Sequence, residues 1–236
     1  SSGQRWLLDC SPDFREQFRE LNRIAPPESL PGLDGILLTH AHIGHYAGLI
    51  HFGREAMGTK EVPVYAMPRM RKFLETEGPW EQLVKLKNIT IRDLTAGQAV
   101  KLNDRISVTP ILVPHRDEYS ETVGFRIEGP NHSALYLPDI DKWTRWKTKI
   151  EAVLETVDLA YLDGTFYANG ELPGRDMAKI PHPFIEESMA RFAPLNAAER
   201  AKVRFLHLNH TSTALDPQHE SAKVIRESGH AVAEEG

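Results

Sequence analysis

Short apolar runs alternate with amphipathic stretches along the whole chain, and turn residues separate them. Apolar runs rich in β-branched residues and bounded by Gly, Pro, Asn or Asp predict buried strands. We expect strands at 6–9, 35–39, 62–66, 89–93, 99–102, 106–113, 122–127, 134–137, 159–162, 203–208 and 231–233. Strands interrupted by amphipathic segments predict an α/β (α+β) fold, with two mixed β-sheets and helices outside them.

The amphipathic stretches predict helices, and two of these begin with clear start signals. Ser11, Pro12 and Asp13 supply an N-cap, a proline at the first helical position and an acid in the first turn, so a helix to about Asn22 follows. A second helix begins at a proline and reaches about Glu77. Further helices are expected at 149–156, 183–192 and 218–228.

One domain over 1–236 is expected, because no linker, repeat or low-complexity tract interrupts the chain. The segment 165–181 is a long loop, and long loops of compact domains are often functional. The net charge of −5 favours a small-molecule substrate over nucleic acid, although a local basic groove stays open. The single cysteine, Cys10, excludes an internal disulfide and a four-cysteine zinc site. No apolar run approaches the ~20 residues of a membrane span, so no membrane partner is expected.

Three histidines crowd the end of an apolar run in LLTHAHIGHYAGL, residues 37–49. His40 and His42 are two residues apart, and side chains at this spacing in an extended chain point the same way. His45 stands at the start of the following helix and can turn toward the same region. Neutral imidazoles are good ligands for Zn²⁺ and Fe²⁺. Three of them within six residues predict a metal site rather than three solvated loop histidines.

The stretch THAHIGHYAGL resembles the T-H-x-H-x-D-H-x-x-G signature of the metallo-β-lactamase superfamily. Four further landmarks of that superfamily stand in the right order: Asp9 before this stretch, and His115, Asp139 and His210 after it. The resemblance implies an αββα sandwich of two β-sheets flanked by helices, with metals bound at one edge. It also allows a homodimer, because members of this superfamily often dimerise.

A narrower resemblance is to the pyrroloquinoline-quinone biosynthesis protein B family. It is carried by WLLDCSPDFREQF, DLAYLDGTFY, KIPHP and FLHLNHTSTALDP, and it covers the chain from about residue 6 to the end. The resemblance implies that an N-terminal strand region of the family is missing here. A cytoplasmic location is expected, with a signal peptide left open. That family has lost several signature histidines, whereas this chain keeps all of them and has His210 where the family has Asn.

The resemblance implies a two-site metal centre, whose ligands are assigned by motif. The first site takes His40, His42 and His115, the second takes His45 and His210, and Asp139 bridges them. Gly44 stands where the signature has Asp, so the second site loses an anionic ligand and is expected to be weak. Two ions with partial second occupancy and a single ion both stay open. The ligand set suits Zn²⁺ first, with Fe²⁺ or Mn²⁺ as alternatives.

Asp163 and His182 occupy the places of the Glu and His in the E-A-T-F and H-S-T segments of ribonuclease Z-like phosphodiesterases. An Asp that orients a His gives a general acid able to protonate a leaving alkoxide, an effect of about 10²–10⁴-fold. This resemblance assigns catalytic roles to Asp163, His182 and Asp139. Two alternatives stay open: His182 as an extra metal ligand that compensates for Gly44, or a strand-capping Asp163 beside a loop histidine.

The leading hypothesis is a metal-dependent hydrolase that acts on a phosphodiester or another small ester. Its nucleophile is hydroxide, which a bound divalent ion makes available at neutral pH by lowering the pKa of water to about 7. An iron-dependent oxygenase or hydroxylase is the alternative that the resemblance to protein B allows. A noncatalytic binding module is a third.

The remaining histidines are expected at the surface or on helices (His51, His132, His219, His230) and in the core or behind a ligand (His207).

Overall fold

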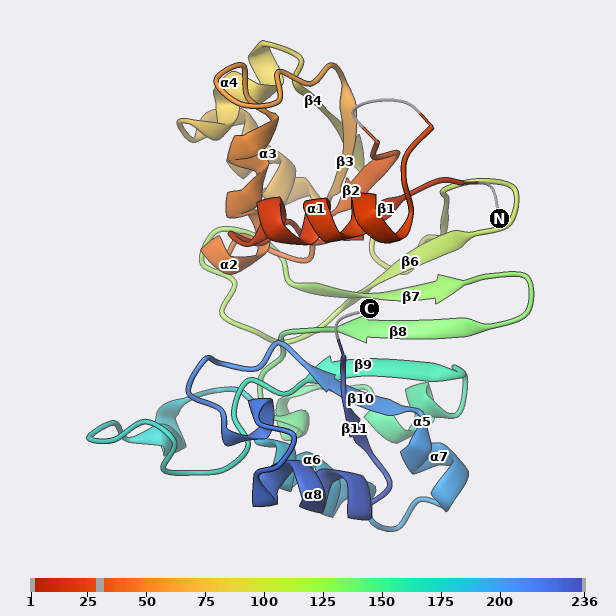
Figure 1. The fold of residues 1–236 in the computed structure, drawn as a ribbon, viewed down its shortest axis with the longest axis vertical. Helices are drawn as coiled ribbons and strands as arrows, with labels where there is room; N and C mark the ends of the chain where they lie inside the picture. The colour runs from red at the N-terminus through yellow and green to blue at the C-terminus, as the bar shows by residue number, and fades with distance from the viewer. Residues whose placement is uncertain (1–2, 29–31, 235–236) are drawn as a thin grey trace. The chain divides into compact units, whose positions relative to one another are not determined.

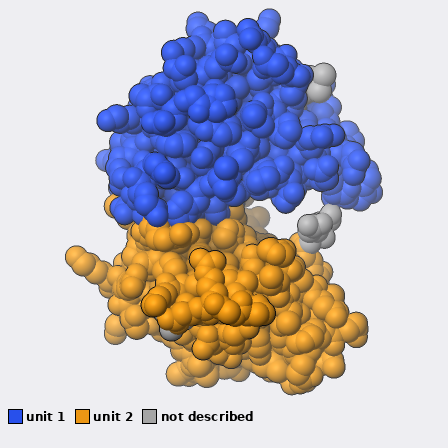
Figure 2. All heavy atoms as spheres, turned by 90° about the vertical axis from the view of Figure 1, so that its left-hand side faces the viewer, with its two compact units in different colours: residues 1–98, 117–122 blue, residues 99–116, 123–236 orange. Residues whose placement is uncertain are grey.

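The computed structural model describes residues 3–28 and 32–234, and Figure 1 draws its ribbon. The chain divides into two compact units, which Figure 2 colours separately. Unit 1 comprises residues 1–98 and 117–122, and unit 2 comprises residues 99–116 and 123–236. The expectation of one domain over 1–236 stays a prediction. In the described part of the chain, no helix is both long and apolar enough to cross a membrane.

Unit 1 holds a four-stranded sheet in the order β1-β2-β3-β4. Its strands are β1 (Trp6–Leu8), β2 (Gly35–Leu37), β3 (Val62–Ala66) and β4 (Ile89–Asp93). Its helices are α1 (Phe14–Ile24), α2 (Ile43–Tyr46), α3 (Pro68–Thr76) and α4 (Trp80–Lys85), with a 3₁₀ segment η1 (Ala47–Phe52). Neighbouring strands are parallel throughout, which corrects the expectation that both sheets are mixed. The reason is that helices connect consecutive strands, and such crossovers produce parallel pairs.

A single apolar cluster packs the helices of unit 1 against its sheet. Ile36 of β2 and Val64 of β3 are fully buried, and α3 contributes the buried Met70 and Leu74 to the same cluster. Phe14, the first residue of α1, is also buried there. Full burial of side chains of this size contributes about 1.5–3 kcal/mol each. This packing fixes the strand ends from which the polar residues of unit 1 project.

Unit 2 holds a seven-stranded sheet in the order β11-β10-β9-β8-β7-β6-β5. Its strands are β5 (Val100–Lys101), β6 (Ser107–Leu112), β7 (Val123–Glu128), β8 (Ser133–Leu137), β9 (Leu159–Asp163), β10 (Val203–Leu206) and β11 (Ala231–Val232). Its helices are α5 (Ile150–Leu154), α6 (Ile185–Phe192), α7 (Ala197–Ala201) and α8 (Glu220–Glu227), with 3₁₀ segments η2 (Trp143–Arg145), η3 (Met177–Lys179) and η4 (Thr213–Leu215). Strands β8 to β11 are parallel and β5 to β8 antiparallel, so this sheet is mixed as predicted.

Helices α5, α6 and α8 cover the parallel part of the unit 2 sheet (Figure 1). Leu154, Phe192 and Ile225 from these helices are buried together with Leu162 of β9 and Phe205 of β10. The predicted α/β fold, with two sheets flanked by helices, is confirmed. The sequence pattern does not predict α4 and α7, which have only six and five residues, too few for a helical period to stand out.

Polar residues of unit 2 follow the carboxyl ends of its strands. Strands β8, β9 and β10 are parallel, and Asp139, Asp163 and His207 stand at or just beyond their ends. Strand β6 runs in the same direction, because β7 is antiparallel to both β6 and β8, and His115 follows it. In open α/β sheets, ligands bind outside the carboxyl ends of the strands. The topology therefore gathers these four residues at one edge of the sheet.

Candidate metal centre

Asp9, directly after β1, anchors the end of that strand to β2. Its backbone N–H donates to the Leu37 carbonyl at 2.8 Å. Its φ of 62° lies in the left-handed region, which Asp adopts more readily than most residues. The backbone N–H of Thr39 donates to Oδ1 of Asp9 at 2.7 Å, and the Thr39 hydroxyl donates to Oδ2 at 2.9 Å. The turn thus buries a carboxylate directly behind the histidine motif.

The Asp9 carboxylate also holds His45, whose Nδ1 lies 2.7 Å from Oδ2. Backbone hydrogen bonds bring the two segments together: Cys10 N–H donates to the His45 carbonyl at 2.8 Å, and Gly48 N–H to the Cys10 carbonyl at 2.9 Å. A Cβ on Gly48 would collide with the Ser11 carbonyl oxygen, so this close approach requires glycine. A carboxylate that accepts Nδ1–H fixes the tautomer in which Nε2 is the metal-binding nitrogen.

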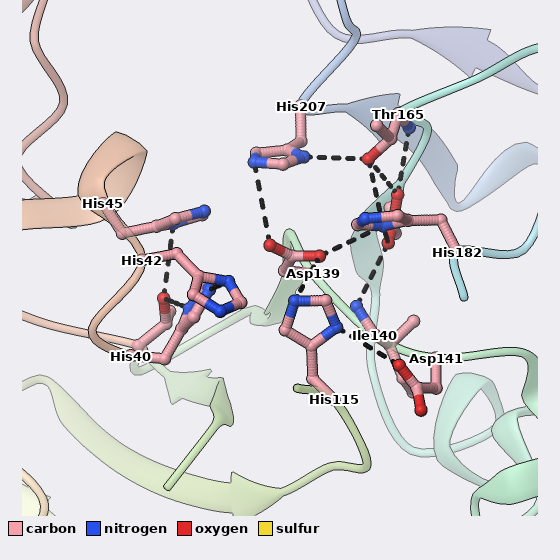
Figure 3. Close-up of polar contacts among 12 residues, drawn as sticks. His40, His42, His45, His115, Asp139, Ile140, Asp141, Thr165, His182 and His207 are labelled. Atoms are coloured by element: carbon pink, nitrogen blue, oxygen red, sulfur yellow. Dashed lines mark hydrogen bonds and ion pairs between the residues drawn. The ribbon is translucent and has the colours of Figure 1, made fainter. Parts of the chain in front are cut away.

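The rings of His40 and His42 lie side by side, nearly perpendicular to each other (Figure 3). Nε2 of His40 lies 2.9 Å from Nδ1 of His42. The opposite nitrogens have polar partners: Nδ1 of His40 lies 2.9 Å from the Thr39 hydroxyl, and Nε2 of His42 lies 3.1 Å from Oε2 of Glu118. Two imidazole nitrogens directed at one point form a donor set that fits a divalent metal.

Gly44, where the signature has Asp, is exposed within α2. A Cβ added there meets no described heavy atom within 4 Å, and the backbone is outside the left-handed region. Neither backbone conformation nor packing within the described structure therefore requires glycine at this position. The chain therefore differs from the signature here in its set of metal ligands, and an aspartate side chain would fit at this position.

Asp139 is the centre of the polar cluster in unit 2 (Figure 3). Its buried carboxylate has Oδ1 3.3 Å from Nε2 of His115 and 3.1 Å from Nδ1 of His182. Its Oδ2 lies 4.0 Å from Nε2 of His207. Behind the His115 ring, Nδ1 lies 3.4 Å from Oδ1 of Asp141, a charge contact without hydrogen-bond geometry. Imidazole nitrogens around one carboxylate are donors that Zn²⁺ and Fe²⁺ accept.

Asp163, the last residue of β9, is fully buried and holds its neighbours in place. Its Oδ1 accepts from the backbone N–H and the hydroxyl of Thr165 at 2.9 and 2.7 Å. Its Oδ2 accepts from the Ile140 N–H at 3.1 Å and from Nδ1–H of His182 at 2.8 Å. Asp139, Asp163 and His182 offer ligand atoms within 4.8 Å of one another. Because four donors already occupy the Asp163 oxygens, Asp163 orients side chains rather than binding an ion.

The carboxylates around His182 alter its protonation. Burial lowers the pKa of His182, but the charge and hydrogen bond of Asp163 and the charge of Asp139 raise it above its ordinary value. A raised pKa keeps the imidazole protonated at higher pH, which is the state that a general acid needs. The predicted Asp163–His182 pair is present, and its catalytic role stays a prediction.

His207, rather than the predicted His210, lies beside Asp139. Strand β10 ends at Leu206, two residues earlier than predicted, and His207 has a φ of 63°. The alternation of side chains along the strand stops there, so the His207 ring is not placed by the face pattern of β10. Nδ1 of His207 lies 2.9 Å from the Thr165 hydroxyl. His210 stands on an exposed turn, and its role as a metal ligand stays a prediction.

Several residues around the cluster are absent from the sequence-based assignment. Thr39 and Thr165 lie inside the motifs THAHIGHYAGL and DLAYLDGTFY, and each hydroxyl donates to a buried carboxylate. Their place within these motifs is the signal in the sequence that could have identified them. Glu118 and Asp141 lie in loops without a recognisable pattern. Cys10 is buried, and burial raises the pKa of its thiol. Among the other histidines, His132 and His219 are exposed as expected, whereas His230 is buried and corrects that expectation.

Residues 4–211 match the beta-lactamase superfamily domain, and the chain belongs to this superfamily. Its two-sheet fold agrees with that assignment. Within the superfamily, the chain is similar along its whole length to coenzyme PQQ synthesis protein B. It is 26% identical over 263 aligned residues to that protein of Xanthomonas oryzae pv. oryzae, covering 100% of this chain and 83% of the relative. The protein of the same name from Methylobacterium nodulans is 25% identical over 264 residues, covering 99% and 83%.

Solved structures show the same fold. Zn²⁺-bound PqqB from Methylobacterium extorquens superimposes with a TM-score of 0.81 at 22% identity, covering 100% of this chain and 83% of the other. A diphosphatase from the PhnP family gives a TM-score of 0.61 at 20% identity, covering 100% and 79%. The predicted resemblance to the superfamily and to its protein B branch is confirmed.

Proposed function

We propose that this protein is a metal-dependent hydrolase that cleaves a phosphodiester or another small ester. The observation that carries this proposal is the buried contact between Asp163 and His182, with Nδ1 of the histidine 2.8 Å from the carboxylate. Such a pair prepares a histidine to give a proton to a leaving oxygen. The similarity to a diphosphatase from the PhnP family supports hydrolysis at phosphorus.

The metal ligands that we propose follow the order of the superfamily signature. They are His40, His42, His45, His115, Asp139 and His207, with zinc as the first choice of metal and iron or manganese as alternatives. Support comes from the donor set within each unit and from the Zn²⁺-bound state of the PqqB relative. When bound, a divalent ion supplies hydroxide at neutral pH and stabilises negative charge on the substrate.

The protein's own residues then have separate tasks. Asp9 holds the ring of His45 from behind, so that its opposite nitrogen keeps its lone pair, and the Asp141 carboxylate lies near Nδ1 of His115. His182 carries the proton destined for the leaving alkoxide on Nε2, because its Nδ1 is engaged by Asp163. The alkoxide would otherwise leave as a strong base, so this proton matters most for poor leaving groups.

The experiment that tests this function is a hydrolase assay of purified protein loaded with Zn²⁺, Mn²⁺ or Fe²⁺. The substrates are bis(4-nitrophenyl) phosphate and 4-nitrophenyl acetate, each measured with His115→Ala as a matched inactive variant. We expect turnover that a chelator abolishes and added metal restores. Equal turnover by the His115→Ala variant, or none with any of the three metals, would contradict the proposal.

The second candidate is the iron-dependent oxygenase or hydroxylase that the sequence resemblance allows, and the whole-chain similarity to coenzyme PQQ synthesis protein B keeps it in place. The same histidines would then hold iron, and the reaction would consume oxygen. Oxygen uptake by the Fe²⁺-loaded protein, measured with an electrode against the Zn²⁺-loaded protein, separates the two candidates. Iron-specific uptake would favour oxygenation, whereas hydrolysis with Zn²⁺ and no uptake would favour the hydrolase.

A further inference from the structure

The Thr165 hydroxyl lies between a carboxylate and two histidine rings in unit 2 (Figure 3). Its oxygen lies 2.7 Å from Oδ1 of Asp163, 2.9 Å from Nδ1 of His207 and 3.3 Å from Nδ1 of His182. A hydroxyl has one proton to donate and two lone pairs with which to accept. How that single proton is shared decides which tautomer the neighbouring rings adopt.

The carboxylate determines where the hydroxyl proton goes. An ionised Asp163 can only accept, and the short contact to Oδ1 is typical of an O–H donor facing an anionic oxygen. The hydroxyl therefore faces His207 with a lone pair, and the His207 ring donates through Nδ1–H. His182 has its own stronger acceptor, since its Nδ1 lies 2.8 Å from Oδ2 of the same carboxylate.

We propose that Thr165 is a positioning residue that fixes His207 as its Nδ1–H tautomer and so directs the Nε2 lone pair toward Asp139. Nε2 lies 4.0 Å from Oδ2 of Asp139, too far for a direct hydrogen bond. The contribution of Thr165 to metal binding rests on the proposed function, whereas the tautomer follows from the hydrogen bonds alone.

Unit 1 contains the same arrangement, built from different segments. The Thr39 hydroxyl donates to Asp9 and lies 2.9 Å from Nδ1 of His40, while Asp9 holds His45 directly. In each unit, one buried carboxylate fixes one histidine directly and a second through a threonine hydroxyl. The repetition of this pattern supports a positioning role rather than a chance contact.

The backbone around Thr165 and His207 is tied down on both sides, which keeps the hydroxyl in place. The Thr165 N–H donates to Oδ1 of Asp163 at 2.9 Å, and its carbonyl accepts from the Asn209 N–H at 2.9 Å. His207 has a φ of 63°, a conformation that costs energy for a residue other than glycine. The strained turn brings the His207 ring to the Thr165 hydroxyl instead of continuing the strand.

The first test is ¹⁵N NMR of histidine-labelled, metal-free wild-type protein at a pH where His207 is neutral. We expect Nδ1 of His207 to resonate as a protonated nitrogen and Nε2 as an unprotonated one. A predominant Nε2–H tautomer in the wild type would overturn the proposal without any variant. Because metal and substrate are absent, this result does not depend on whether the protein proves to be a hydrolase.

The second test compares three variants for the His207 tautomer and for the Zn²⁺ dissociation constant. Thr165→Val should abolish the preference for Nδ1–H and weaken Zn²⁺ binding about 10–100-fold, the usual effect of losing such an outer hydrogen bond. Thr165→Ser should restore both, since it keeps the hydroxyl. Ser212→Ala, which removes another buried hydroxyl from the loop after β10, should change neither. An unchanged tautomer in folded Thr165→Val protein, or no rescue by serine, would refute the role of Thr165.

Discussion

The Asp9 carboxylate and the His45 ring lie 2.7 Å apart although 36 residues separate them in the chain. Asp9→Asn should weaken Zn²⁺ binding about 10–100-fold, because a neutral amide is a poorer acceptor for Nδ1–H and no longer stabilises the charge that develops on the ring. Asn also tolerates the left-handed backbone at this position, so the turn should survive. Competition with a chromophoric chelator measures the dissociation constant.

Asp13→Asn is the matched control for this substitution. It removes the same charge from an exposed acid at the start of α1, four residues further along the chain. Its Zn²⁺ affinity should equal that of the wild type. A similar loss in both variants would show that net charge, and not the Asp9–His45 contact, controls affinity.

Gly44→Asp should strengthen binding of a second metal equivalent. The position is exposed, has room for a Cβ and does not need a glycine conformation, so the acid is expected to fit without destabilising α2. An added anionic ligand should raise the second affinity at least about tenfold, equivalent to ~1.4 kcal/mol. Isothermal titration calorimetry of the metal-free protein measures both equivalents, and Gly44→Asn controls for size without charge. If the two variants bind equally, the acid does not act as a ligand.

His182→Ala should slow hydrolysis of an alkyl phosphodiester much more than that of a nitrophenyl ester. The general acid protonates the departing oxygen, and nitrophenolate leaves without that help, so the loss should be about 10²–10⁴-fold for the alkyl ester alone. Steady-state kcat for both substrates measures the difference, with His132→Ala as an exposed-histidine control. Equal losses on both substrates, together with weaker metal binding, would instead identify His182 as a ligand.

Much of the fold is predictable from the sequence because strands and helices are encoded locally. β3 and β4 have their predicted bounds, since apolar runs with clear turn residues on both sides mark them. The parallel character of the unit 1 sheet is not predictable in the same way. It depends on how helices such as α1 and α3 pack after the strands form, which a strand pattern alone does not specify.

The candidate site is predictable where it follows strand ends and unpredictable where a turn redirects the chain. His40, His115, Asp139 and Asp163 all stand at or just beyond strand ends that the apolar pattern marks. The position of His207 beside Asp139 is unpredictable from the strand pattern, because its positive φ ends the alternation of side chains along β10. Backbone strain of this kind depends on tertiary contacts and leaves no period in the sequence.

His230 should make the protein sensitive to acid. It is 4% exposed against Phe192 and Phe205, and burial together with the nearby Arg200 lowers its pKa from 6.5 to about 4. The unfolded chain binds this proton more tightly than the folded one, so the stability contributed by neutral His230 is complete above pH 6.5. It is lost as pH falls toward 4, by about 3 kcal/mol.

His230→Phe removes the titrating group. Urea unfolding of metal-free wild type and variant at pH 7.5 and pH 4.5 should therefore show a smaller pH-dependent loss of unfolding free energy in the variant. Identical losses in the two proteins would show that other groups, chiefly carboxylates, account for the acid sensitivity.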